Sequence, residues 1–595
     1  MTDTSSPKLI AETVAALPAS ASEQFGSKVA ARYRSGDEWA EMTYEEATHA
    51  IQEIALGLIE MGMEPGERVC ILSNTRLEWT LCSFGISAAG GVVVPVYPTN
   101  SPSECKWVAG DSGARIAICE DEEQRRKFEQ VWDELPELEH LIVIEPQGGQ
   151  LSLEELRSRG TRRDAGELAE RQDNVKPEDP YTIVYTSGTT GPPKGSELTH
   201  RNAMFVGLVA QELDFVTPEE TIYLYLPLAH VFALITMLAS FDRGTCLVFF
   251  GGDTRKILEE IIATKPTYLP SVPRIFEKIY AAAIKMQEQA SAEDQERFRH
   301  AIKLGVEVRQ RQQRGEPVPD EMQAAFDQAD EQIFKMVRGL FGGQLRLAVS
   351  GAAPIAAEIL EFFYAAGVPV MEGWGLTETT AVGTVGTPDA FKFGTVGKAV
   401  PGVEIRIAEE DGEILIKGPN IFKEYWNNPE ATADTLIDEW LHTGDLGQLD
   451  DEGYLTITGR KKDIIITAGG KNLTPSNIEN DLKQSRFVSQ AVMYGDRRPY
   501  PVALITLDPE EIVPWAQEHG LPEDPGDLAE EEQVKQLVQN ELDRANANYA
   551  QVEQIKKFRI LDHDLSIDTG ELTPTLKVKR NVVYDRYADL FESMY

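Results

Sequence analysis

The chain has 595 residues, 42% of them hydrophobic and 26% charged. This composition is typical of a globular protein that is too long for a single core and forms about three to four domain-sized units. It carries 57 basic and 97 acidic residues, a formal net charge of −40, which excludes nucleic acid and an anionic membrane surface as partners held by overall charge. A solvated acidic surface explains this charge most simply, with a high-salt habitat as the alternative.

The N-terminal residues and the cysteines favour a cytoplasmic location. Met1–Leu17 shows no basic segment followed by an apolar one, so we expect no secretory signal. The 5 cysteines show no Cys-x-x-Cys spacing and mostly have apolar neighbours, which is typical of reduced core residues. No combination of Cys and His has the spacing of a metal site.

Short β-rich runs alternate with helical stretches between residues 69 and 370. Segments such as Leu77–Ala89 and Ile355–Ala366 carry apolar residues at helical spacing. This alternation predicts an α/β fold in which a parallel sheet is covered by helices on both faces. The expected strands are Arg68–Leu72, Gly91–Val96, Arg115–Cys119, Leu141–Ile144, Thr182–Thr186, Thr245–Phe250 and Leu345–Ser350.

One uncharged run, Ile222–Phe241, is long enough to cross a bilayer. Pro227 and His230 stand in its middle, and tyrosines alternate with apolar residues before them. The run therefore predicts a buried strand, a turn and a buried helix rather than a transmembrane helix.

Three further regions complete the expected organisation. Residues 276–340 carry apolar positions at helical spacing, broken at Gly315–Pro319, which predicts an inserted pair or trio of amphipathic helices packed on the core. Residues 401–460 are strand-rich. We place the boundary so that residues 1–460 form a large N-terminal domain and residues 461–595 a small α+β domain on a hinge. The strands expected after residue 401 are Glu404–Ile407, Glu413–Ile416, Tyr454–Thr458 and Ile464–Thr467.

The segment Tyr185–Gly195 has the residues of a polyphosphate-binding loop. It joins hydroxyl-rich turns, three glycines and Lys194 directly after the apolar run Tyr181–Val184. Glycines let backbone N–H groups approach phosphate oxygens, hydroxyls donate hydrogen bonds, and a lysine supplies a positive charge. The spacing differs from the common Gly-Lys-Ser/Thr loop because Pro193 precedes the lysine. Thr199–Asn202 opens a helix just beyond.

Two clusters after predicted strands are suited to a nucleotide base. Ser350–Pro354 is built of small residues before a helix, which lets a flat ring lie against the backbone. Glu372–Glu378 sets Trp374 between glycines and adds a hydroxyl and a carboxylate. A carboxylate together with phosphate oxygens is a normal ligand set for Mg²⁺. A tight turn and a core tryptophan are the structural alternatives.

Charged clusters follow in the last third of the chain. Trp440–Gly447 places Asp445 in a glycine-bounded turn, where a carboxylate can bind ribose hydroxyls or serve as an ordinary turn residue. Arg460–Lys462 and Leu576–Arg580 are basic runs in a strongly acidic chain, which favours anion contacts over a merely solvated face.

These five clusters, in this order and approximate spacing, resemble the adenylate-forming (AMP-binding) superfamily over roughly Asp37 to the C-terminus. Glu413–Pro419 and Tyr425–Thr432 add to the resemblance. Within the superfamily, Leu226–Phe232, the inserted helices and Gly570–Lys577 look like bacterial long-chain fatty acyl-CoA synthetases. The resemblance implies a large N-terminal domain of layered sheets and helices, with a small β-rich subdomain and a mobile C-terminal domain.

The resemblance also implies a role for each matching residue. Lys577 would span the fatty carboxylate and the α-phosphate, His230 would line the acyl pocket beside the reacting carboxylate, and Glu378 would act with Thr186 in holding Mg²⁺. Lys462 would be the hinge. The implied nucleotide-binding residues are Thr186, Ser187, Gly188, Thr189, Thr190, Gly191 and Lys194 for phosphates, Gly351, Ala352, Ala353, Glu372, Gly373, Trp374, Gly375 and Thr377 around adenine and Mg²⁺, and Asp445 and Arg460 for ribose.

The chain departs from the family pattern at two positions. Trp374 stands where tyrosine is commoner, and an indole still stacks on adenine. Leu576 replaces a glycine that often precedes the catalytic lysine, which leaves Lys579 as the alternative to Lys577.

The expected activity is ATP-dependent conversion of a medium- or long-chain fatty acid to acyl-AMP and then to acyl-CoA. ATP, Mg²⁺ and coenzyme A are the implied cofactors and co-substrates, and no nucleic acid is expected. An acyl-AMP ligase that loads a carrier protein is the alternative within the enzyme class. A catalytically inactive ATP-binding regulatory or scaffold protein is the alternative from another class. A homodimer and peripheral contact with the inner face of a membrane are left open.

Overall fold

The computed structural model describes residues 8–186, 192–288, 291–468, 471–567, 569–573 and 577–595. The chain divides into two compact units. Unit 1 comprises residues 1–405 and 416–441, and unit 2 comprises residues 406–415 and 442–595. The domain boundary after residue 460 stays a prediction.

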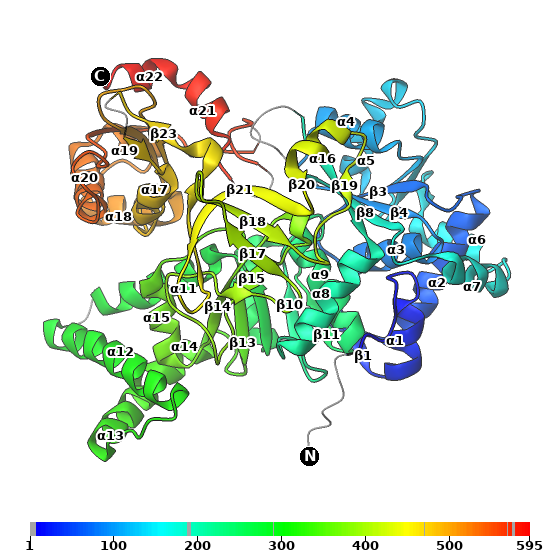
Figure 1. Cartoon of the computed structure of the whole chain (residues 1–595), viewed down its shortest axis with the longest axis horizontal. Helices are drawn as coiled ribbons and strands as arrows, with labels where there is room; N and C mark the ends of the chain where they lie inside the picture. The colour runs from blue at the N-terminus through cyan, green and yellow to red at the C-terminus, as the bar shows by residue number, and fades with distance from the viewer. Residues whose placement is uncertain (1–7, 187–191, 289–290, 469–470, 568, 574–576) are drawn as a thin grey trace. The chain divides into compact units, whose positions relative to one another are not determined.

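A nine-stranded sheet forms one half of unit 1, with the order β16-β15-β14-β13-β12-β10-β11-β1-β2 (Figure 1). Its inner strands, from β14 to β1, run parallel, while β2, β15 and β16 add antiparallel edges. The strands are β1 (Val29–Ser35), β2 (Glu38–Thr43), β10 (Thr221–Leu224), β11 (Cys246–Phe249), β12 (Tyr268–Ser271), β13 (Leu347–Ser350), β14 (Val370–Trp374), β15 (Thr384–Val385) and β16 (Lys398–Ala399).

An eight-stranded sheet forms the other half, with the order β19-β9-β8-β4-β3-β5-β6-β7. The strands from β8 to β7 are parallel, and β9 and β19 are antiparallel. The strands are β3 (Arg68–Leu72), β4 (Val92–Val96), β5 (Ile116–Cys119), β6 (His140–Val143), β7 (Leu151–Ser152), β8 (Pro180–Thr186), β9 (Lys194–Thr199) and β19 (Glu424–Tyr425).

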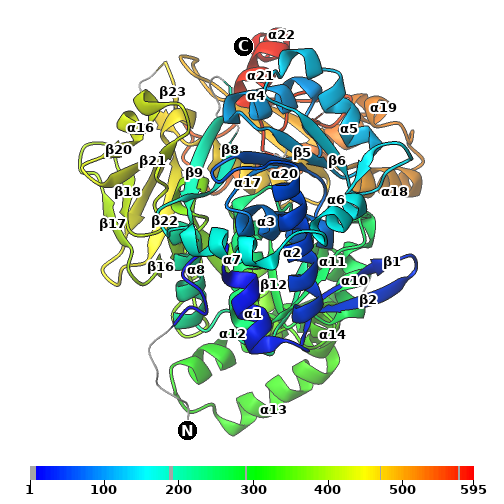
Figure 2. The ribbon, with the colours of Figure 1, turned by 90° about the vertical axis from the view of Figure 1, so that its right-hand side faces the viewer.

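Helices of unit 1 cover both of its large sheets. Figure 2 shows α2, α3, α6 and α7 lying together. The helices are α1 (Leu17–Phe25), α2 (Tyr44–Glu60), α3 (Leu77–Ala88), α4 (Pro102–Ser112), α5 (Glu122–Glu129), α6 (Leu153–Gly160), α7 (Ala165–Asn174), α8 (His200–Glu212), α9 (Val231–Arg243), α10 (Ile257–Thr264), α15 (Ala357–Ala366) and α16 (Pro429–Thr435).

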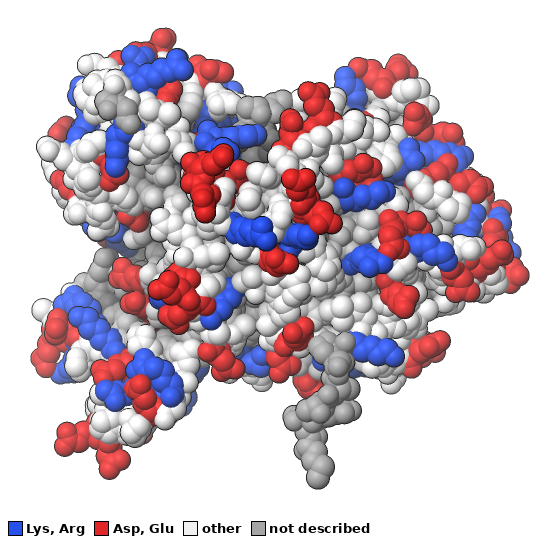
Figure 3. All heavy atoms as spheres, viewed as in Figure 1, with Lys and Arg blue, Asp and Glu red and all other residues white. Residues whose placement is uncertain are grey.

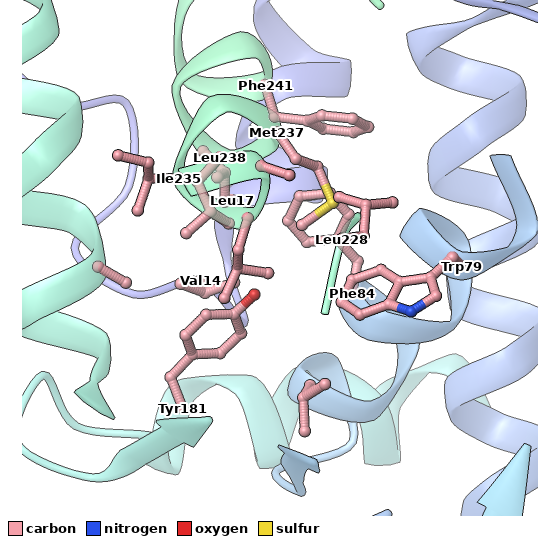
Figure 4. Close-up of a cluster of buried hydrophobic side chains, with 14 of the residues drawn as sticks. Val14, Leu17, Trp79, Phe84, Tyr181, Leu228, Ile235, Met237, Leu238 and Phe241 are labelled. Atoms are coloured by element: carbon pink, nitrogen blue, oxygen red, sulfur yellow. The ribbon is translucent and has the colours of Figure 1, made fainter. Parts of the chain in front are cut away.

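The two faces of each sheet pack into different cores because successive strand residues point to opposite faces. Val69 of β3 and Ile222 of β10 join the core shared by both sheets, whereas Cys70 and Tyr223 join separate outer cores. In the shared core, Figure 4 shows α3 and α9 meeting through aromatic side chains. The ring centroids of Phe84 and Phe241 lie 4.4 Å apart there.

The predicted α/β alternation is confirmed, and so are the layered sheets that the resemblance implies. The strands divide between two sheets, and five antiparallel edge strands extend them. Short local runs specify strand and helix, while the sheet that a strand joins depends on contacts distant in sequence. The uncharged run at residues 222–241 forms β10 and α9, as expected, and within the described part of the chain no helix is both long and apolar enough to cross a membrane.

The inserted helices pack on the outer face of the nine-stranded sheet. Phe298, Val308 and Phe334 are buried there with residues of α15, while α12 and α13 project outward (Figure 1). The predicted break at Gly315–Pro319 separates α12 from α13. The segments are α11 (Pro273–Glu288), α12 (Ala292–Gln313), α13 (Asp320–Ala329), a π-helix (Asp330–Phe334) and α14 (Lys335–Gly339).

The expected β-rich part forms a five-stranded sheet, with the order β17-β18-β21-β20 and β22 paired to β21. On the face of the whole chain that Figure 3 shows, acidic and basic side chains are interspersed. The strands are β17 (Glu404–Ile407), β18 (Glu413–Lys417), β20 (Leu436–Ile437), β21 (Trp440–Leu449) and β22 (Leu455–Arg460).

The C-terminal part of unit 2 has the expected α+β character. Its three-stranded sheet separates two cores, because Ala491 and Met493 pack with α17 and α20 whereas Val492 packs beside Val583 and Phe591. The elements are β23 (Ile465–Ile466), β24 (Asn472–Leu473), α17 (Pro475–Lys483), β25 (Val488–Tyr494), β26 (Val502–Leu507), α18 (Pro509–His519), α19 (Pro525–Glu530), α20 (Glu532–Asn546), β27 (Lys557–Ile560), α21 (Arg580–Arg586) and α22 (Ala588–Glu592).

A buried histidine at the start of α8 makes the stability of unit 1 depend on pH. His200 is 2% exposed, its Nδ1 accepts the N–H of Val14 at 3.2 Å, and burial lowers its pKa to about 4. The folded state therefore loses stability through this residue as pH falls from about 6.5 to about 4, by roughly 1.4 kcal/mol per unit at most. We expect His200→Asn, whose side-chain oxygen can accept the same bond, to lack this slope. Melting temperatures of the native chain and of His200→Asn from pH 7 to pH 4 measure this difference. Melting temperatures that fall in parallel with pH in both proteins would contradict the prediction.

Candidate active site

The predicted phosphate loop lies at the end of a β-hairpin. β8 and β9 pair antiparallel, with Thr186 opposite Lys194 and Tyr185 opposite Gly195. A Cβ on Gly195 would lie 2.7 Å from the side chain of Ile183, so this close approach requires glycine. Beyond the hairpin, α8 begins after Thr199, as the sequence predicts, and Thr199 caps it through a capping box with Asn202. Ser187, Gly188, Thr189, Thr190 and Gly191 lie outside the described residues.

Helix α4 holds both arms of this hairpin. The indole N–H of Trp107 donates to the carbonyl of Pro193 at 2.8 Å. The hydroxyl of Tyr185 donates to a carboxylate oxygen of Asp111 at 2.6 Å. Trp107 is 37% exposed, so its hydrogen bond to Pro193 does not lie in a hydrophobic core. The two contacts hold Tyr185 of β8 and Pro193, which precedes β9.

Three side chains from separate segments are linked by contacts: Lys194, Tyr425 and Glu378. The Lys194 ammonium lies 4.4 Å from the ring centroid of Tyr425, and the Tyr425 hydroxyl donates to Glu378 Oε1 at 2.6 Å. The carbonyl of Glu378 also accepts the N–H of Phe422 at 2.8 Å. The structure thus brings together a cation, a carboxylate and the end of the phosphate loop, as expected for Lys194 and Glu378.

The two clusters expected around adenine lie at the carboxyl ends of neighbouring strands. Ser350 of β13 pairs with Glu372 of β14 in a parallel register. A Cβ on Gly351 would lie 3.6 Å from the Gly373 carbonyl and 3.6 Å from the ring of Phe232. The first turn of α9 therefore also reaches this place, and the carboxyl ends of parallel strands are where α/β sheets bind ligands.

The backbone around these strand ends is closely packed and locally strained. A Cβ on Gly375 would lie 2.2 Å from the carbonyl of Ala381. Ala352 has φ 67°, in the left-handed region that favours glycine. The expected residues Ala352 and Ala353 are exposed, and Trp374 and Thr377 are half-buried. The Ser350 hydroxyl is buried and has no hydrogen-bond partner among the described residues.

Glu372 has an unusual carboxyl group at the same strand ends. Burial raises the pKa of Glu372 to about 8, although a hydrogen bond from the Ile355 backbone N–H partly lowers this pKa. The folded state thus holds this carboxyl protonated at neutral pH, whereas the unfolded chain ionises near pH 4.5. An uncharged acid here would not repel a polyphosphate or a fatty carboxylate.

Replacing Glu372 with glutamine therefore has a pH-dependent effect on stability. We expect Glu372→Gln to gain stability relative to the native chain as pH rises from about 4.5 to about 8, by at most about 1.4 kcal/mol per unit. Melting temperatures at pH 5, 7 and 8.5 measure this difference. Glu361→Gln, at an exposed position of α15, is the matched control. A difference that stays constant with pH would contradict the raised pKa.

His230 lies at the N-terminus of α9. Its Nδ1 accepts the N–H of Phe232 at 3.2 Å, which makes it the N-cap of that helix. The preceding turn is held by Thr75, whose hydroxyl donates to the Leu226 carbonyl at 2.7 Å and accepts the Leu228 N–H at 3.0 Å. His230 is thereby placed near Phe232 and the strand ends, and its contact with an acyl chain stays a prediction.

Unit 2 brings the two expected ribose residues together. Asp445 is 4% exposed and pairs with Arg460 across β21 and β22, with Arg460 Nε 3.0 Å from Asp445 Oδ1. Lys461 ion-pairs with Asp411 at 2.6 Å. Lys462 follows in the short 3₁₀ helix Lys461–Asp463 that leads to β23, where the predicted hinge falls.

Lys577 lies in a small hairpin of unit 2. Its carbonyl accepts the Thr573 N–H at 2.8 Å, and its N–H donates to the Thr573 hydroxyl at 3.0 Å. Leu572 and Val578 form an antiparallel bridge beside it. The hairpin is anchored by Glu571, which is 0% exposed and ion-pairs with Arg586 at 2.8 Å. The Lys577 side chain is exposed, as a lysine that reaches a substrate requires. Leu576 lies outside the described residues.

The donors in unit 1 fit Mg²⁺ held together with phosphate. Thr186 and Glu378 offer a hydroxyl and a carboxylate, the oxygen ligands that Mg²⁺ takes, and the metal commonly completes its shell with phosphate oxygens and water. Among the described residues, no group of three or more His, Cys, Asp or Glu could hold a metal alone. The donor set therefore suits a metal that arrives with a nucleotide rather than a resident ion.

Sequence reasoning missed Trp107, Asp111 and Tyr425. Trp107 and Asp111 are four residues apart on α4 and so share a face, but no local signal links them to the phosphate loop. Tyr425 begins the segment Tyr425–Thr432, which contributed to the prediction only through its resemblance to the family.

Comparison with known proteins agrees with this geometry. Residues 18–426 match the AMP-binding enzyme family, and residues 462–595 match the AMP-binding enzyme C-terminal domain. The long-chain-fatty-acid–CoA ligase FadD15 of Mycobacterium tuberculosis is 39% identical over 563 residues, which cover 94% of this chain and 92% of that protein. The long-chain-fatty-acid–CoA ligase ACSBG2 of Xenopus laevis is 32% identical over 612 residues, with 96% and 82% covered.

Solved structures share the fold at lower identity. The anthranilate CoA ligase AuaEII in complex with anthranoyl-AMP superposes with a TM-score of 0.72 at 22% identity, covering 96% of this chain and 97% of that one. The layered α/β architecture of this chain is therefore shared with that structure.

Proposed function

Because this chain belongs to the AMP-binding enzyme family, we propose that it converts a medium- or long-chain fatty acid, ATP and coenzyme A to acyl-CoA, AMP and pyrophosphate. The observation that carries this proposal is the junction of Lys194, Tyr425 and Glu378 at the end of the β8–β9 hairpin. The chain is similar over both units to two fatty-acid–CoA ligases. This similarity supports a fatty acid as the substrate.

In the first step, a carboxylate oxygen of the fatty acid attacks the α-phosphorus of ATP. A new P–O bond forms, the bond to the β-phosphate oxygen breaks, and pyrophosphate leaves with the electron pair. The difficulty is electrostatic, because one anion approaches another. Lys194 and Lys577 face the charge that develops on the phosphates, which is where such catalysis gains most. When bound, Mg²⁺ held by Thr186 and Glu378 would neutralise phosphate charge.

Each unit carries residues with a proposed role toward the nucleotide. In unit 1, Gly351, Ala352, Ala353, Gly373 and Trp374 would flank adenine. Asp445 and Arg460 bind the ribose hydroxyls, and the Asp445–Arg460 ion pair of 3.0 Å supports this role because it fixes the carboxylate.

In the second step, the sulfur of coenzyme A attacks the acyl carbonyl carbon of acyl-AMP. The C–S bond forms, the bond to the AMP oxygen breaks, AMP leaves with the electron pair, and the thiol proton passes to solvent. A lysine held over the phosphates is needed only in the first step. Rotation of the C-terminal domain about Lys462 would withdraw it, since a few residues at the end of an element can absorb such a change.

The proposal is tested by separating the half-reactions. Fatty-acid-dependent ATP–pyrophosphate exchange without coenzyme A, together with AMP release that requires coenzyme A, is the expected result. Exchange without turnover on coenzyme A would indicate an acyl-AMP ligase that awaits a carrier protein. ATP binding without either reaction would indicate the inactive regulatory alternative.

A further inference from the structure

Tyr425 connects two groups that the nucleotide site needs. It ends β19, opposite Ser196 of β9, and is 6% exposed. One face of its ring lies under the Lys194 ammonium, at 4.4 Å from the centroid. Its hydroxyl donates to Glu378 Oε1 at 2.6 Å. Both contacts lie within unit 1.

The surroundings of Tyr425 hold its ring in one place. Its backbone N–H donates to the Thr432 hydroxyl at 2.9 Å, and its ring packs edge-on against Phe422, with centroids 4.8 Å apart. The adjacent Lys423 ion-pairs with Glu197 at 2.8 Å. Tyr425 itself contacts both Lys194 and Glu378.

The chemistry of the phenol suits this arrangement. The phenol hydroxyl is a hydrogen-bond donor, and the carboxylate of Glu378 is its acceptor. A carboxylate has two oxygens, and a fixed bond to Oε1 orients Oε2 for a cation. The electron-rich ring face attracts an ammonium without neutralising it, which leaves the Lys194 charge available for a phosphate.

We propose that Tyr425 is a positioning residue of the nucleotide site, whose hydroxyl orients Glu378 toward Mg²⁺ and whose ring holds Lys194 ready for the phosphates of ATP. This inference rests on the proposed function only in taking ATP as the nucleotide. A purely structural tyrosine would affect stability but would not distinguish ATP with Mg²⁺ from ATP alone.

The test compares two substitutions by calorimetric titration of the full chain with ATP, once with Mg²⁺ and once with EDTA. Tyr425→Phe keeps the ring and loses the hydroxyl, so we expect about tenfold weaker binding with Mg²⁺ and little change in EDTA. Tyr425→Leu also loses the ring face, so binding weakens in both conditions. The Mg²⁺ concentration that half-saturates pyrophosphate exchange rises for Tyr425→Phe.

Tyr280→Phe is the matched control. The Tyr280 hydroxyl donates to Glu358 Oε1 at 2.8 Å, the same type of bond on α11 and α15, and its loss should leave ATP binding unchanged. Equal effects of Tyr425→Phe with and without Mg²⁺, or no effect, would overturn the proposal, as would a native chain that binds no ATP. If Tyr425→Leu does not fold, Tyr425→Phe decides. A native chain that binds ATP but activates no fatty acid would refute the proposed function and leave the Tyr425 result standing.

Discussion

Replacing Lys577 with alanine is expected to lower ATP–pyrophosphate exchange by about 10²–10³-fold, the loss typical of one group aimed at developing charge. Backbone bonds to Thr573 and the anchored Glu571 fix the hairpin that carries Lys577, and the side chain itself is exposed. Alanine should therefore leave folding unchanged. Thioester formation from supplied acyl-AMP should stay within about threefold of the native rate, because the α-phosphate has already been transferred.

Lys579 provides the control for this prediction. It is half-buried, and its N–H donates to the Glu571 carbonyl at 2.7 Å, so its position is fixed in the same hairpin. Lys579→Ala should retain most of the exchange activity. Native exchange in Lys577→Ala combined with loss in Lys579→Ala would transfer the catalytic role to Lys579.

Replacing Lys462 with proline is expected to separate the two half-reactions. Lys462 lies in the 3₁₀ helix Lys461–Asp463 between β22 and β23, and proline fixes φ and removes the backbone N–H. If the hinge turns at this residue, one conformation becomes inaccessible. We expect either pyrophosphate exchange or thioester formation from acyl-AMP to fall by more than about tenfold, with the other changed by less than about threefold.

The control for the hinge prediction is Lys462→Ala, which removes the charge and keeps the backbone free. It should retain both half-reactions. Equal losses of both in Lys462→Pro, at unchanged melting temperature, would contradict a hinge at this residue. Loss of both with a lowered melting temperature would mean instead that the proline disrupts unit 2, and would equally remove the support for the hinge.

Several strands and helices could be predicted because their signals are local. The predicted strand Arg68–Leu72 agrees with β3 at both ends, and the helix expected at Leu77–Ala89 ends one residue earlier in the structure. The capping box at Thr199 and the break at Gly315–Pro319 are also local. The division of the strands between two sheets is not local, so the alternation that predicts an α/β fold does not reveal it.

The candidate site shows the same division between local and distant information. Lys194 and Glu378 were expected from their motifs, and the resemblance to a family supplied their roles. The Tyr425–Glu378 bond joins residues 47 positions apart, and the Trp107–Pro193 bond joins residues 86 positions apart. Nothing in the spacing of either pair indicates contact, because such bonds depend on how β9, β19 and α4 pack.

The most direct test of the account is the product formed from ATP, Mg²⁺, coenzyme A and a series of fatty acids from C2 to C20, identified by mass spectrometry. We predict acyl-CoA and AMP in equal amounts, in yields that rise into the medium- and long-chain range because each buried CH₂ contributes about 0.8 kcal/mol. Absence of acyl-CoA with every acid, under conditions in which the chain binds ATP, would contradict the assignment of fatty acids as its substrates.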